Sequence, residues 1–79
     1  MQDQAAPEIV FAYELVWIFR ERLSSFDDCS PSIAIAVVPS KSGWTAVTTK
    51  RDRARRPNCV RRIELIQRQL REVYVLEKD

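Results

Sequence analysis

A chain of 79 residues, 46% hydrophobic and with a formal net charge of +2, is large enough for one small domain and too apolar to be a disordered segment. It has no histidine and one glycine, so the commonest zinc and haem ligand is missing and glycine-rich nucleotide-binding loops cannot form. We therefore expect a single α+β domain over residues 1–79 that needs no cofactor or metal, with frayed ends at 1–6 and 78–79.

The first predicted element is a helix from Pro7 to about Ser25. Pro7 suits the first turn of a helix, where its missing N–H group costs nothing, and Glu8 complements the positive end of the helix dipole. Apolar residues recur at spacings of three and four: Ala12, Leu15, Val16, Phe19, Leu23 and Phe26. Several other apolar residues lie off this stripe, which is typical of a helix buried on more than one side.

Two strands are expected next, at Ser32 to Val38 and Trp44 to Thr49, joined by a loop at Pro39 to Gly43. Gly43 is available for a positive φ angle in that loop. If Val38 lies opposite Trp44, one face of the hairpin carries bulky aliphatic side chains and the other carries alanines.

A second helix is expected from Pro57 or Asn58, residue types suited to a helix start. Its predicted apolar stripe is Cys59, Ile63, Ile66, Leu70 and Val73. The resulting fold class is α+β in the order α-β-β-α, with a hairpin packed against two helices. This order, with a basic segment before the last helix, loosely resembles double-stranded-RNA-binding domains. Those domains have a third strand that is missing here, so no residue roles are carried over.

Cys29 and Cys59 are expected to be small apolar residues in a reducing compartment, since two cysteines make no disulfide framework; their pairing is left open. The apolar run Ile9 to Phe19 contains Glu14 and is shorter than the about 20 residues of a membrane span. The residues before it lack the positive charge of a signal peptide. The sequence therefore predicts a soluble, cytoplasmic protein with no membrane partner.

A homodimer is expected because one hairpin cannot cover the first helix. A two-stranded hairpin is marginal in water and has two open edges, and the first helix region holds five of the seven aromatic residues. Two copies would associate through this helix, or through strand edges that combine into a four-stranded sheet. The expected interface anchors are Phe11, Trp17 and Phe19.

The segment from Lys50 to Arg62 contains seven basic residues and one acid. Arginines next to a helix start favour phosphate binding, because the helix dipole and the free N–H groups there also attract anions. Trp44 could add a stacked base. The candidate polyanion-binding residues are Arg51, Arg53, Arg55, Arg56, Arg61 and Arg62. In the alternative reading, the segment is a solvated linker or is neutralised by acids such as Glu21 and Asp27.

Catalysis is not expected. Without histidine, the serines have no common activating base, and the adjacent acids Asp27 and Asp28 fit a turn that ends a helix. The sequence therefore predicts a non-catalytic protein-interaction module that self-associates through its aromatic-rich first helix. The alternative is nucleic-acid binding through the basic segment 50–62.

Overall fold

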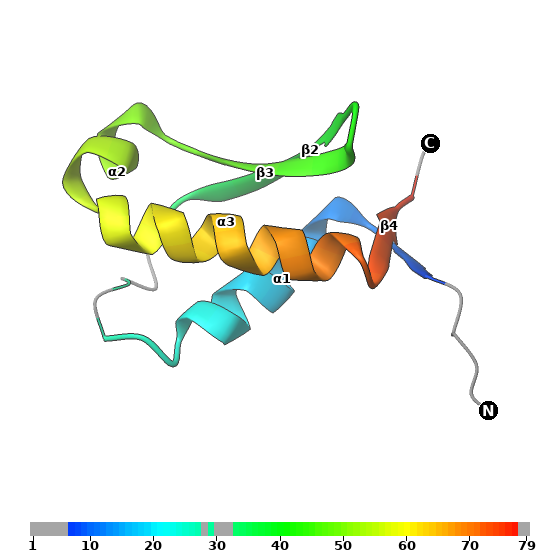
Figure 1. Ribbon diagram of the computed structural model, residues 1–79, viewed down its shortest axis with the longest axis horizontal. Helices are drawn as coiled ribbons and strands as arrows, with labels where there is room; N and C mark the ends of the chain where they lie inside the picture. Colours follow the sequence, from blue (N-terminus) through cyan, green and yellow to red (C-terminus); the bar gives the residue numbers. More distant parts are fainter. Residues whose placement is uncertain (1–6, 28, 30–32, 78–79) are drawn as a thin grey trace.

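The computed structural model describes residues 7–27, 29 and 33–77. Its elements in chain order are β1 (Glu8–Val10), α1 (Ala12–Leu23), β2 (Ile35–Ser40), β3 (Gly43–Thr48), α2 (Lys50–Arg55), α3 (Pro57–Arg71) and β4 (Tyr74–Leu76). The antiparallel β2–β3 hairpin lies over α1 and α3, and β1 pairs with β4 in parallel at the opposite end from α2 (Figure 1). The α+β class is confirmed, whereas the predicted fraying falls outside the described residues.

The chain enters the domain as a strand, so the prediction that the first helix starts at Pro7 is wrong. Residues Glu8–Val10 form β1, which pairs with β4 in the register Ile9 to Val75. The backbone N–H of Glu8 donates to the Val73 carbonyl at 2.9 Å. This pairing between the two ends of the chain outweighs the local preference of proline for a helix start.

Helix α1 begins at Ala12 with Phe11 as its N-cap residue. The Glu14 carboxylate accepts a hydrogen bond of 2.8 Å from the Phe11 backbone N–H, which satisfies a donor that the helix leaves open. Its buried side chains are Leu15, Phe19 and Leu23. The predicted spacing of the stripe is therefore confirmed, although the helix is shorter than expected.

The hairpin register differs by one residue from the prediction. Val38 lies opposite Thr45, and Trp44 lies opposite Pro39. The predicted five-residue loop is a two-residue turn between Ser40 and Gly43, where Gly43 has a φ of 105°. A shift of one residue moves a side chain to the other face of a sheet, so Trp44 points into the core instead of lying at an exposed strand end.

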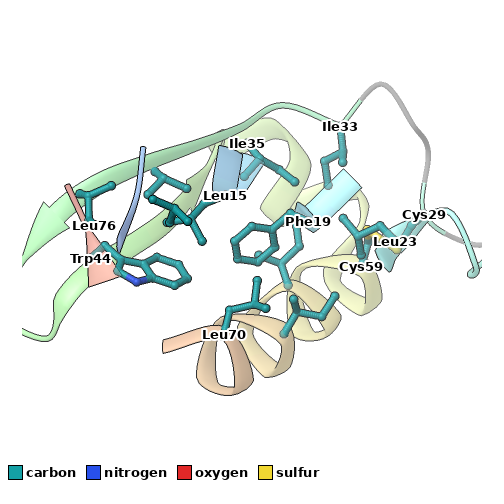
Figure 2. Close-up of a cluster of buried hydrophobic side chains, with 14 residues drawn as sticks. Leu15, Phe19, Leu23, Cys29, Ile33, Ile35, Trp44, Cys59, Leu70 and Leu76 are labelled. Atoms are coloured by element: carbon teal, nitrogen blue, oxygen red, sulfur yellow. A yellow bond between two sulfur atoms is a disulfide. The ribbon is translucent and has the colours of Figure 1, made fainter. Parts of the chain in front are cut away.

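The core lies between the hairpin and the two long helices (Figure 2). Trp44 is only 1% exposed and meets Phe19 edge to face, with ring centroids 6.0 Å apart. The predicted stripe of the second helix is buried at Cys59, Ile63, Ile66 and Leu70. Its fifth member, Val73, is exposed, because α3 ends at Arg71 and the chain turns into β4.

A short helix, which the sequence did not predict, occupies the first part of the basic segment. Helix α2 begins after Thr49, whose side-chain hydroxyl accepts a hydrogen bond of 3.1 Å from the Asp52 backbone N–H. No side chain of α2 is buried. The helix therefore meets the domain through polar contacts, such as those of Asp52 with Ala34 N–H and of Arg53 with the Thr48 carbonyl, and its basic side chains are exposed.

Cys29 and Cys59 form a disulfide, which contradicts the expectation of two unpaired cysteines. Their Cα atoms lie 5.3 Å apart, and both residues are buried at the edge of the core (Figure 2). The bond joins the segment after α1 to the first turn of α3. It supplies the kind of covalent link that small domains use to supplement a limited core.

Candidate interaction surfaces

Exposed apolar side chains lie on β1, on β4 and at the start of α1, at the end of the molecule opposite α2. Ile9 and Val75 lie side by side on the outer face of the β1–β4 pair, 63% and 45% exposed, while Val10 and Leu76 face the core. Parallel strands are normally covered on both faces, so an open apolar face on this pair is unusual. We use the name apolar end surface for the exposed apolar residues of these elements taken together, which are Ile9, Phe11, Tyr13, Trp17, Val73 and Val75.

An open hollow of about 450 Å³ lies beside this surface, between α1 and the β1–β4 pair. Three aromatic side chains line it, those of Tyr13, Trp17 and Tyr74. The remaining lining residues are Glu8, Glu14, Val10 and Ile18. We call it the aromatic hollow. It combines aromatic rings with two carboxylates.

The outer edge of β3 is closed by side chains. With a two-residue turn, the residues flanking the turn form a hydrogen-bonded pair and the pairs then alternate along the hairpin. Trp44, Ala46 and Thr48 therefore direct their backbone groups away from β2. Three side chains meet them: Arg71 Nε donates to the Trp44 carbonyl at 2.8 Å, Gln67 Oε1 accepts from Ala46 N–H at 2.6 Å, and Arg53 Nη1 donates to the Thr48 carbonyl at 2.6 Å.

The outer edge of β2 differs from that of β3. The outward-facing backbone groups belong to Ile35, Val37 and Pro39, and no hydrogen bond within the described part of the chain reaches those of Ile35 or Val37. Pro39 has no N–H group and so ends the available edge. A second hollow, of about 460 Å³, lies between Val37 and Pro39 of β2 and Phe11 and Tyr13 at the start of α1.

The predicted interface anchors separate into two groups. Phe11 and Trp17 are 48% and 63% exposed and belong to the apolar end surface. Phe19 is fully buried against Trp44, so its prediction as a surface anchor is wrong. Tyr13 was missed, although its position four residues before Trp17 places it on the same side of the helix. Its ring stacks on that of Phe11 with the centroids 5.8 Å apart.

The predicted polyanion-binding arginines lie around α2 and the start of α3, at the opposite end of the molecule from the apolar end surface (Figure 1). Arg51, Arg53, Arg55 and Arg61 are exposed, while Arg56 and Arg62 are half-buried. The structure brings these residues to one end of the domain. Trp44, the aromatic proposed to stack on a base, is buried and cannot serve that role in the folded domain.

Several of these arginines have partners within the basic segment or next to it. Arg56 forms an ion pair of 3.7 Å with Asp52. Arg61 donates to the side chain of Asn58 at 3.2 Å, and the Arg62 guanidinium lies 4.0 Å from the centre of the Phe26 ring. Where both partners are described residues, the Arg56–Asp52 pair is the one ion pair found. In the alternative reading, the acids Glu14, Glu21, Asp27 and Asp28 neutralise the segment. No ion pair joins the first three to it within the described residues, and Asp28 lies outside them. Neutralisation across a dimer stays a prediction.

Comparison of the chain with protein-family models, with curated proteins and with solved structures finds no match. Within the described residues, no helix has the length and apolar character needed to cross a membrane. Any functional assignment therefore rests on the surfaces described above.

Proposed function

We propose that this domain is a non-catalytic protein-interaction module that forms a homodimer through the outer edge of β2 and the adjacent aromatic start of α1. The observation that carries the proposal is the difference between the two edges of the hairpin. Side chains of α3 and α2 close the β3 edge, whereas no hydrogen bond within the described residues reaches the outward-facing backbone groups of Ile35 and Val37 on the β2 edge. That edge borders the stacked rings of Phe11 and Tyr13.

The pairing has a definite register. Antiparallel alignment centred on Ala36 places Ile35 of one copy opposite Val37 of the other, so their outward-facing backbone groups form hydrogen bonds in both directions. The result is a four-stranded sheet. No charged side chain lies between Ile35 and Ser40, although charges are a common protection of exposed strand edges.

The dimer predicts a specific effect of a charge at Ala36. In the proposed register the two copies of residue 36 face each other directly, so Ala36→Lys places two ammonium groups in contact. We expect dimer affinity to fall about fivefold or more, because opposed like charges destabilise a cross-strand pair by roughly 1 kcal/mol. Light scattering coupled to size-exclusion chromatography, run over a range of concentrations, measures the change.

The matched control is Val47→Lys, which places the same charge on the same exposed face of the hairpin but on the closed strand β3. It should leave the dimer unchanged. A wild-type mass that stays near 9.2 kDa at all concentrations would exclude self-association altogether. Equal effects of the two lysines would place the interface elsewhere.

Polyanion binding is a second candidate, supported by the absence of buried side chains on α2 and by its exposed arginines. It predicts that nucleic-acid affinity falls steeply with salt, with a log–log slope of about −0.9 for each phosphate contacted on duplex DNA. Arg51→Ala and Arg55→Ala together should reduce that slope, whereas Arg68→Ala on the exposed side of α3 should not. An anisotropy titration at two salt concentrations tests this; no binding at low salt rejects it.

A cytoplasmic location stays a prediction. The disulfide between Cys29 and Cys59 counts against it, because such bonds persist in oxidising compartments and are rare in the cytosol.

A further inference from the structure

We infer that the aromatic hollow binds a positively charged side chain, arginine or lysine, presented by an apolar segment of another protein. The inference rests on the proposed role of the domain as an interaction module, but not on its dimer. It concerns the hollow between α1 and the β1–β4 pair rather than the edge of β2.

Two of the aromatic side chains that line the hollow are exposed to solvent, although exposing large apolar rings to water is unfavourable. Tyr13 and Trp17 are 71% and 63% exposed, and their spacing of four residues places both on one side of α1. Tyrosine and tryptophan are the residue types that most often dominate binding at protein interfaces. Tyr74, from β4, completes the lining on the other side.

Contacts within the domain restrain the Tyr13 ring and the backbone of Tyr74 before any ligand arrives. The Tyr13 ring stacks on Phe11 with an angle of 7° between the ring planes. Tyr74 lies in β4, and its backbone carbonyl accepts a hydrogen bond of 3.2 Å from Trp44 Nε1–H in the core. Because these contacts restrict the Tyr13 ring and the Tyr74 backbone, a ligand loses less free energy in ordering the site.

The charged residues that line the hollow favour a positively charged ligand. Glu8 and Glu14 are among its lining residues, and none of those lining residues is basic, in a chain whose net charge is +2. A guanidinium or ammonium group over the face of an aromatic ring gains further from the ring quadrupole. Carboxylates and aromatic faces together therefore favour a cation and disfavour an anion.

The size and lining of the hollow favour a side chain on a partner segment over a bare metal ion. Hard cations such as calcium need six or more oxygen ligands, and two carboxylates among aromatic rings do not supply them. A hollow of about 450 Å³ has the volume of a typical ligand pocket. Its apolar lining at Val10 and Ile18 suits aliphatic groups on either side of the charged one.

Trp17 provides a direct readout of binding. The only other tryptophan, Trp44, is 1% exposed, so quenching of tryptophan fluorescence by acrylamide reports mainly on Trp17. The probe is the capped tripeptide Leu-Arg-Leu, compared with Leu-citrulline-Leu, which has nearly the same shape without the charge, and with Leu-Glu-Leu. We expect the arginine peptide to shield Trp17 and the other two to bind at least about threefold more weakly, as loss of a charge-assisted contact predicts.

Variants of the two carboxylates test which residues provide the charge. Glu8→Gln combined with Glu14→Gln should weaken the arginine peptide about three- to tenfold, the range expected for two partly exposed charge pairs. Glutamine at position 14 keeps an oxygen acceptor for the Phe11 N–H, so the start of α1 is preserved. Glu64→Gln, an exposed carboxylate on α3, is the matched control and should have no effect.

The inference would be overturned if the arginine peptide did not shield Trp17, if the citrulline peptide bound equally well, or if Glu64→Gln and the double variant had equal effects. Shielding of Trp17 that rises with protein concentration in the absence of peptide would identify a second copy as the occupant and would also overturn it. The dimer is tested separately, since Ala36→Lys leaves the hollow intact and the glutamine variants leave the β2 edge intact.

Discussion

Replacing Trp44 with alanine is expected to lower the free energy of unfolding by about 3–5 kcal/mol, the usual cost of removing a buried tryptophan. The side chain is 1% exposed and packs edge to face on Phe19. Its Nε1–H group donates to the Tyr74 carbonyl, and the Arg71 guanidinium lies 5.8 Å from its ring centre. Because domains of this kind have a total stability of about 5–15 kcal/mol, the loss would remove a large part of it.

Urea unfolding followed by circular dichroism measures this change. Trp17→Ala is the matched control, since it removes the same side chain from an exposed position, and its effect should stay below about 1 kcal/mol. Trp44→Phe should lie between the two, because it keeps part of the ring volume but loses the hydrogen bond to Tyr74. Equal destabilisation by the two alanine variants would contradict the placement of Trp44 in the core.

The position of Trp44 could not be predicted because the sequence specifies alternation more clearly than register. Ile33, Ile35 and Val37, which the alternation places on one face of the strand, are all buried. The register depends on the turn, and the expected five-residue loop is in fact a two-residue turn. The shorter turn shifts the register by one residue, so that Val38 lies opposite Thr45 instead of Trp44. This shift places Trp44 in the core, whereas the sequence analysis placed it at a strand end where it could stack on a base.

The short strands β1 and β4 could not be predicted from the sequence for a different reason. Each contains three residues, and they pair across nearly the whole length of the chain, from Ile9 to Val75. Local patterns carry no information about such a contact. The aromatic hollow and the apolar end surface both depend on this pairing, so neither could be predicted as a site.

Those parts of the candidate sites that lie within one helix were predictable. The surplus of apolar residues on the first helix indicated exposed aromatic side chains, and the structure exposes Trp17. The same surplus could not show which of these aromatic side chains is buried, because the burial of Phe19 depends on where the hairpin packs. The stripe on α3 was predictable from Cys59 to Leu70, since its spacing alone determines one buried face.

Among the features that the sequence analysis did not predict, the disulfide is expected to have a large effect on stability. Reduction of the Cys29–Cys59 bond is expected to lower the free energy of unfolding by about 3.5 kcal/mol, because the bond closes a loop with a sequence separation of 30 residues and restricts the unfolded chain. Urea unfolding of the oxidised and reduced protein, under otherwise identical conditions, gives the difference directly.

One further variant separates the loss of the bond from a loss of packing. The double variant Cys29→Ala and Cys59→Ala cannot form the bond but keeps small apolar side chains at both buried positions. If the restriction of the unfolded chain accounts for the effect, this variant and the reduced wild type should unfold at similar urea concentrations. An unchanged midpoint on reduction, or two titratable thiols in the fully stable native protein, would contradict the prediction. Titratable thiols would also restore the original expectation of unpaired cysteines and remove the argument against a reducing compartment.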